Sequence, residues 1–175
     1  MSVTRSDTAG LRSVLGRFAT GVTVVTTSHG APCGMTANAF TSVSLDPPLV
    51  LVCISRNANI YKAVLDAGCF AVSMLSADQE HVARYFADHS RPRGAAEFDA
   101  VEWSPGPGTG APVLHGCLAW LDCSLVNSYD GGDHEIFLGS VLDSGSGMDG
   151  DALVFFRGGF HRPPLVPLVG RGNPT

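Results

Sequence analysis

The stretch of residues 34–55 constrains the fold of this chain more than any other part of it. Two strand-like runs flank a polar segment, residues 36–44, and a Pro47-Pro48 corner. Each proline fixes its own φ and holds the residue before it in an extended conformation. The continuous apolar run Leu49–Ile54 that follows is typical of a strand buried on both faces. Taken alone, the stretch predicts a polar hairpin followed by a core strand.

Strands outnumber helices in the rest of the chain. Runs rich in β-branched and apolar residues predict strands, and apolar residues at helical spacing predict three modest helices. We expect helices over residues 7–18 (capped by Ser6 or Asp7), over 57–67 and after Ser76; we expect strands at 22–27, 33–36, 49–54, 69–75, 114–128, 134–142 and 153–157, with loops at 88–112 and 143–151.

These elements do not alternate as a doubly wound sheet requires. Closely spaced strands with few helices instead predict a mainly β fold, a closed antiparallel barrel with peripheral helices. At 175 residues the chain is long enough for one domain with a substantial core. We place that domain at residues 1–162 and expect a peripheral Pro/Gly-rich tail over 163–175.

Charge and hydropathy argue against two classes of partner. The formal net charge is −5 and the basic residues are scattered, so we expect no nucleic-acid surface. The sequence has no apolar run of about 18 residues, so we expect no membrane span. Residues 1–7 contain no apolar segment of the signal-peptide type, and we expect a cytoplasmic protein.

The cysteines favour a reduced protein. Their number, five, is odd, no Cys-x-x-Cys occurs, and at least four of them lie in apolar, strand-like runs. This pattern is typical of buried thiols rather than of a disulfide framework or a zinc site. The five are Cys33, Cys53, Cys69, Cys117 and Cys123.

The common motifs of self-contained catalysis are missing from the sequence. Its single Gly-x-Gly-x-x-Gly, residues 145–150, lies in a predicted loop and opens no predicted helix, and the sequence has no Gly-x4-Gly-Lys-Ser/Thr and no nucleophile elbow. The six histidines show no metal-ligand spacing, so we expect no metal. What remains is two polar Gly/Ser/Thr/Asn segments and one Gly-Asp-His turn. That content fits a protein whose bound cofactor supplies the chemistry.

Four segments together resemble the flavin reductase-like family, whose fold, the FMN-binding split barrel, implies a closed antiparallel (split, Greek-key) β-barrel. Each segment alone is a weak signal, but all four in this order, over about residues 11–161, are quite specific. Within that family the chain is most similar to short NAD(P)H:flavin oxidoreductases that serve two-component flavin monooxygenases. The segments are Phe18–Thr27, Gly34–Val50, Gly131–His134 and Phe155–Gly159.

The resemblance implies hydride transfer from NADH or NADPH to FMN or FAD, in a homodimer with the flavin near the subunit interface. A separate oxygenase would then consume the reduced flavin. The implied flavin-ring residues are Thr36, Ala37, Asn38, Ala39, Phe40, Ser42, Val43, Phe86 and Ala87; the implied phosphate residues are Ser55, Asn57, Ala58 and Asn59, with Arg56 nearby; the implied nicotinamide-nucleotide residues are Gly132, Asp133, His134, Phe155, Phe156, Arg157 and Gly158.

Two observations on single residues qualify this assignment. The helix expected to begin near Asn57 or Asn59 independently favours an anion there, because its first N–H groups lack helical partners. Ala39 stands where the family often has serine, whose hydroxyl commonly reaches the flavin ring. Backbone N–H groups can still bond the edge of the ring at that position.

The roles of three polar residues stay open between function and structure. His134, our candidate catalytic residue, could orient the nicotinamide nucleotide or balance protons near the reduced flavin, or it could be a strand histidine bonded to a neighbour. Arg157 could pair with a nucleotide phosphate or be an ordinary rim arginine. Asp133 could contact the ligand or cap the turn, and we favour the cap.

Two other functions compete with the reductase hypothesis. A non-catalytic flavin-binding protein could use the same barrel. An oxidase of the pyridoxamine-phosphate type would ordinarily need more Arg and Lys around the phosphate than this chain offers. The choices between FMN and FAD, and between NADH and NADPH, remain open at this stage.

Overall fold

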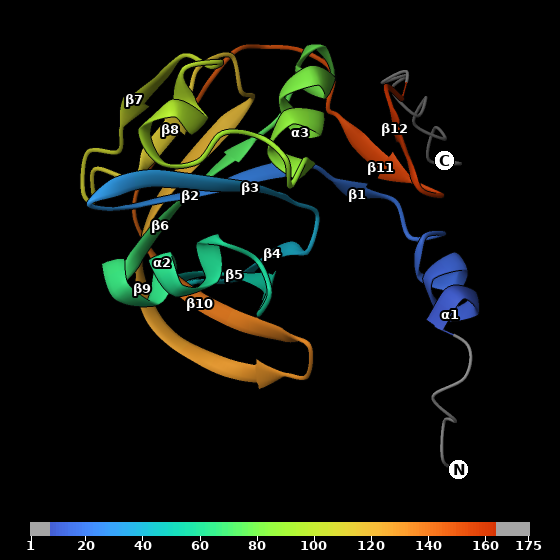
Figure 1. The fold of residues 1–175 in the computed structure, drawn as a ribbon, viewed down its shortest axis with the longest axis horizontal. Helices are drawn as coiled ribbons and strands as arrows, with labels where there is room; N and C mark the ends of the chain where they lie inside the picture. Colours follow the sequence, from blue (N-terminus) through green and yellow to red (C-terminus); the bar gives the residue numbers. More distant parts are fainter. Residues whose placement is uncertain (1–7, 164–175) are drawn as a thin grey trace, which may run out of the picture.

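The computed structural model describes residues 8–163, and its architecture is mainly β with few helices (Figure 1). The predicted cap residues Ser6 and Asp7 lie outside the described part of the chain, as does nearly all of the tail predicted from residue 163.

A seven-stranded antiparallel sheet forms the body of the molecule. Its strand order is β3-β2-β6-β9-β10-β5-β4, so three of the six neighbouring pairs (β2 with β3, β4 with β5, β9 with β10) are consecutive in the chain and three are not. The strands confirm the prediction of a mainly β, antiparallel fold. Their bounds are β2 Thr23–His29, β3 Ala31–Ala37, β4 Phe40–Leu45, β5 Pro48–Ser55, β6 Cys69–Met74, β9 Ala119–Gly131 and β10 His134–Ser146.

The two outer strands of this sheet follow each other directly in the chain. Only Asn38 and Ala39 separate β3 from β4, although five other strands lie between them in the sheet order. Because successive Cα atoms are about 3.8 Å apart, this connection can span at most about 11 Å. The sheet therefore curls until one end of each edge strand meets the other at Asn38–Ala39.

Smaller strands and helices surround the sheet (Figure 1). A three-stranded sheet has the order β1-β11-β12, and β7 pairs with β8. The remaining bounds are β1 Thr20–Gly21, β7 Trp103–Pro105, β8 Pro112–Leu114, β11 Val154–Phe156, β12 Gly159–His161, α1 Thr8–Leu15, α2 Ile60–Ala67 and α3 Glu80–Ala87, with 3-10 helices at Ala77–Gln79 and Gly94–Phe98.

Two of the three apolar clusters in the core hold α2 and α3 in place. Ile60 and Val64 of α2 are buried in one cluster with Phe70 and Phe137, two large fully buried side chains. Phe86 of α3 lies in the other cluster and contacts Phe98, so this side chain faces inward. Each helix is thus held by apolar side chains on one face.

The N-terminal helix differs from its prediction. α1 ends at Leu15 rather than near residue 18, and none of its residues is buried. The apolar residues expected on its inner face are more than half exposed: Leu11 56%, Val14 65%, Leu15 62% and, just after the helix, Phe18 77%. The helical spacing correctly predicts a helix, but within residues 8–163 no surface covers its apolar side.

Two strand boundaries also differ from the sequence expectation. The strand predicted over 114–128 is broken after β8 at Gly116, whose φ of 74° is the left-handed conformation that glycine favours. The segment 143–146, predicted as loop, continues β10 because it pairs with β9 as far as Ser146↔Ala119. β4 was predicted only as a polar segment.

The five cysteines are free thiols in the described structure. Burial raises the pKa of Cys33 to about 11 and the pKa of Cys123 to about 12, so both remain protonated near neutral pH. Neither thiol has the lowered pKa of a nucleophile. Among the described residues, no helix is long and apolar enough to cross a membrane.

Candidate functional site

Two neighbouring pockets flank the Asn38–Ala39 connection. The first, here called the polar pocket, has a volume of about 340 Å³; the second, here called the apolar groove, has a volume of about 710 Å³. The polar pocket is lined by Gly34, Met35, Thr36, Ser55, Asn57, Ala58, Asn59, Ile60, Phe86, Ala87, His89 and Arg91. The apolar groove is lined by Arg12, Leu15, Gly16, Phe18, Thr20, Asn38, Ala39, Phe40, Thr41, Leu51, Cys53, Phe155 and Gly158.

One face of β5 joins the two pockets. Side chains alternate between the faces of a strand, and in β5 the residues at 50, 52 and 54 are buried while Leu51, Cys53 and Ser55 are half-buried. Leu51 and Cys53 line the apolar groove, and Ser55 lines the polar pocket. The strand therefore offers a continuous wall that is apolar at one end and polar at the other.

The β9–β10 turn extends this wall. His134 pairs with Ser55 across β10 and β5, so the two side chains lie on the same face of the sheet. The imidazole Nδ1–H donates to Asp133 Oδ1 at 2.7 Å. That hydrogen bond, together with the charges of His134 and Arg12, lowers the pKa of the Asp133 carboxyl. The turn is thus within electrostatic reach of Arg12 in the apolar groove.

The start of α2 opens into the polar pocket. Asn59 occupies the N-cap position that the sequence predicts, but its side chain makes no capping hydrogen bond. Before it, Asn57 N donates to Ser55 Oγ at 3.3 Å and Ala58 N donates to Ser55 O at 2.9 Å. A helix start with polar side chains beside it is suited to an anion, because the macrodipole places partial positive charge there.

A buried ion pair holds the loop that closes the other side of the polar pocket. Glu97 is 3% exposed, and its Oε1 accepts hydrogen bonds from Arg91 Nε at 2.9 Å and from Gly34 N at 3.2 Å. The Arg91 guanidinium also lies over the Phe86 ring, 5.5 Å from its centroid. Arg91 therefore positions the loop, and its charge is largely balanced by Glu97.

Sequence reasoning missed His89 and Arg91 as pocket residues. Both lie in a Gly/Pro-rich loop that has no helical or strand periodicity to orient its side chains. Arg91 belongs to a local group of basic residues at 91–93, which was a weak signal, and His89 had none. Arg56, expected near the phosphate, instead forms ion pairs with Asp130 at 3.1 Å and Glu135 at 2.7 Å.

Close packing between β3 and α3 shapes the floor of the polar pocket. A Cβ on Gly34 would lie 2.8 Å from Phe86 Cε1, so only glycine lets the ring approach the strand. Thr36 Oγ1 donates to Ala83 O at 2.7 Å, which ties its hydroxyl to α3. Thr36 and Phe86 thus line the pocket while also serving the fold.

A third pocket, of about 520 Å³, adjoins the apolar groove and gathers three arginines. Arg12, Arg17 and Arg157 line it together with Gly158. Arg157 N donates to Gly16 O at 2.7 Å, and the Arg157 guanidinium lies over the Phe156 ring at 5.1 Å. Arg157 also has a φ of 50°, which is rare for a residue with a side chain.

The structure brings most of the sequence-predicted site residues to these pockets, but not all of them. Ala37 is buried in the core at 6% exposure, while Ser42 and Val43 lie on the exposed outer strand β4. Gly132, Asp133, His134 and Phe156 line none of the three pockets, although His134 lies beside Ser55. Within residues 8–163, no three His, Cys, Asp or Glu side chains are grouped to hold a metal ion.

Comparison with known proteins gives one family. A model of the flavin reductase like domain matches residues 15–164. The NADH-dependent FAD reductase of Streptomyces globisporus is 49% identical over 156 residues, which are 89% of this chain and 86% of that protein.

Solved structures of flavin reductases are similar to this chain in both sequence and fold. BorF, the flavin reductase component of a bacterial two-component tryptophan halogenase, superimposes with a TM-score of 0.86 at 49% identity over 89% of this chain and 98% of that one. The Streptomyces globisporus NADH:FAD oxidoreductase SgcE6, in complex with NAD and FAD fragments, gives a TM-score of 0.87 at 44% identity over 97% and 99% of the two chains.

Proposed function

The chain belongs to the flavin reductase-like domain family, and on that premise we propose that it is an NAD(P)H:flavin oxidoreductase. Its substrates are a nicotinamide nucleotide and FMN or FAD, and a separate flavin-dependent monooxygenase or halogenase receives the reduced flavin. The two Streptomyces globisporus matches described above are named as an NADH-dependent FAD reductase and an NADH:FAD oxidoreductase, which supports NADH as the donor and FAD as an acceptor.

The single observation that carries this proposal is the two-part wall of β5. Leu51 and Cys53 in the apolar groove suit a flat ring, and Ser55 leads to the start of α2, which suits the flavin phosphate. The bound flavin accepts a hydride from the nicotinamide, and the protein must hold the two rings roughly 3–3.5 Å apart for this transfer.

At the ring end, Asn38, Ala39 and Phe40 form the wall of the apolar groove. Asn38 Nδ2 donates to Thr20 Oγ1 at 3.2 Å, which fixes the amide at the β3–β4 connection. Ala39 offers no hydroxyl, so the ring edge relies on backbone groups, and Ser42 and Val43 extend the wall along β4. We expect Ala37 to act through its backbone.

At the phosphate end, Asn57 and Asn59 offer side-chain amides on either side of Ala58, and Ala87 and His89 also line the pocket. The nicotinamide nucleotide contacts the turn Gly132–His134 and the segment 155–158, where three arginines suit its phosphates. His134 Nδ1 is held by Asp133, which leaves Nε2 free to orient the donor.

We also propose that the sheet is the split barrel of the family and that the protein is a homodimer. The two-residue β3–β4 connection supports closure of the barrel at that end. The exposed apolar side of α1 and the half-buried face of β5 and β10 support a second copy that covers them. We expect one domain over residues 1–162 and a cytoplasmic location.

The experiment that tests this function follows the loss of NADH in the presence and absence of added FMN, FAD or riboflavin. We expect oxidation only when a flavin is present. Steady NADH loss that does not depend on flavin would show the mechanism to be wrong.

His134→Ala separates a functional from a structural role for that residue. Loss of one hydrogen bond to the donor is worth about 1 kcal/mol, so we expect the KM for NADH to rise or turnover to fall by about fivefold. Flavin binding, measured by fluorescence titration, should change little. Unaltered kinetics would show that His134 has only a structural role.

A further inference from the structure

A fourth pocket lies apart from the flavin site, beside the β7–β8 hairpin. Figure 1 shows β7 and β8 on the opposite side of the molecule from α1. The pocket has a volume of about 440 Å³, within the usual range of small-molecule sites, roughly 300–1,000 Å³. It shares no lining residue with the polar pocket or the apolar groove.

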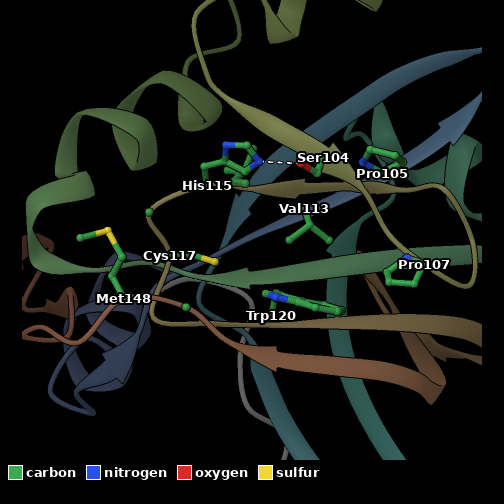
Figure 2. A pocket seen from close by; sticks show the side chains of 11 residues that line it. Ser104, Pro105, Pro107, Val113, His115, Cys117, Trp120 and Met148 are labelled. Atoms are coloured by element: carbon green, nitrogen blue, oxygen red, sulfur yellow. Dashed lines mark hydrogen bonds between the residues drawn. The ribbon is translucent and has the colours of Figure 1, made fainter.

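The inner part of this pocket is apolar and carries no charge. Figure 2 shows Val113 and Trp120 facing each other, with Cys117 to one side. The Trp120 indole lies against the backbone of β10, because a Cβ on Gly145 would come within 2.6 Å of it. Burial raises the pKa of the Cys117 thiol, which therefore stays neutral. This floor suits an uncharged aromatic ring.

The mouth of the pocket is polar, and the side chains of Ser104 and His115 are hydrogen-bonded to each other there. Ser104 Oγ lies 2.6 Å from His115 Nε2, and His115 Nδ1 lies 3.8 Å from Glu102 Oε2 (Figure 2 shows the Ser104–His115 bond). The Glu102 carboxylate lies nearer to Nδ1 and favours the tautomer that carries its proton there; in that tautomer Nε2 accepts the hydrogen bond from the Ser104 hydroxyl. The lone pairs of Ser104 Oγ are then left to accept a hydrogen bond.

We propose that this pocket binds a small uncharged phenol, with its ring against Trp120 and its hydroxyl donating to Ser104 Oγ. A benzoate is disfavoured, because its carboxylate could only accept hydrogen bonds at Ser104 and would be repelled by Glu102. A ring without a donor group fits the floor but leaves Ser104 without its ligand bond. The proposal does not depend on the flavin chemistry.

The test titrates the full chain with phenol, anisole and benzoate, and follows binding by calorimetry and by NMR shifts of the pocket residues. We expect saturable binding of phenol, with anisole about five- to tenfold weaker, the worth of one neutral hydrogen bond. Ser104→Ala should remove this preference by weakening phenol alone. Ser28→Ala, at an exposed serine outside the pocket, is the matched control and should change nothing.

Repeating the phenol titration with saturating FMN shows which of the two sites binds phenol. If phenol binds beside Trp120, FMN leaves its affinity unchanged; if FMN displaces phenol, the phenol occupies the flavin site and the proposal is wrong. Equal binding of phenol and anisole, unchanged phenol binding in Ser104→Ala, or no saturable binding would each overturn it as well.

Discussion

At the scale of single residues, the most demanding interaction is the buried pair of Arg91 and Glu97. The two side chains are 8% and 3% exposed, and both bond to the backbone of Gly34. Such a pair costs desolvation when it forms, but removing one partner leaves the other charge buried and unpaired. The pair therefore controls whether the loop 88–98 stays folded over the polar pocket.

Glu97→Ala should lower the free energy of unfolding by about 3–5 kcal/mol, because Arg91 loses its partner inside the protein. Urea unfolding measures this change, and we also expect weaker flavin binding. Glu80→Ala is the matched control: it removes the exposed Arg84–Glu80 pair, whose loss should cost less than about 1 kcal/mol. Equal effects of the two substitutions would show that the buried pair has no special role.

The buried thiols predict a pH dependence of stability in the alkaline range. Burial raises the pKa of Cys33 to about 11 and of Cys123 to about 12, from an ordinary value of 9.0. Above pH 9 the unfolded chain loses these protons first, so the free energy of unfolding falls as pH rises from 9 toward 12.

Unfolding at pH 8.5 and pH 10.5, roughly on either side of the ordinary thiol pKa, measures this loss. In Cys123→Ala the stability will be lower at both pH values because of the cavity, but the difference between them should be smaller. A pH difference that is as large in Cys123→Ala as in the wild type would exclude this thiol as its source.

At the scale of elements, α1 shows where sequence reasoning reaches its limit. The spacing of Leu11, Val14 and Leu15 correctly indicates a helix with one apolar side, but periodicity does not say whether the covering surface belongs to the same chain. Here the side is exposed. β4 was missed for a related reason, since Thr41, Ser42 and Ser44 suit a polar outer strand better than a core strand.

Phe18→Ser tests whether a second copy covers this apolar side. Phe18 is 77% exposed within one chain, so loss of its side chain should not unfold the monomer. We expect the substitution to weaken the homodimer at least tenfold, because a buried aromatic anchor typically contributes about 2 kcal/mol or more to an interface. Sedimentation equilibrium gives the dissociation constant.

Leu65→Ser, at a 40%-exposed leucine on α2, is the control and should leave the dimer intact. A wild-type protein that sediments as a monomer, or a Phe18→Ser dimer as tight as the wild type, would contradict the assignment of α1 to an interface.

At the scale of the whole molecule, a mainly β, antiparallel fold was predictable because β-branched runs and glycine turns are local signals. The number of strands was not, since the sequence predicted seven and the described residues form twelve. The site was not predictable from local signals alone. It joins β5, the start of α2 and the loop that contains His89, and only the fold brings these segments together. The family resemblance pointed to residues 36–40 and 55–59. His89 and Arg91 were not predicted, because the loop that contains them has no periodic pattern.

The central claim is that one wall holds a flavin ring and leaves room for a nicotinamide beside it. The most direct measurement is an anaerobic absorbance trace of the visible flavin band after protein and FAD are mixed with NADH. We predict that the band bleaches rapidly with protein and only very slowly without it. A band that the protein shifts on binding but that NADH does not bleach would identify a non-catalytic flavin-binding protein and contradict this account.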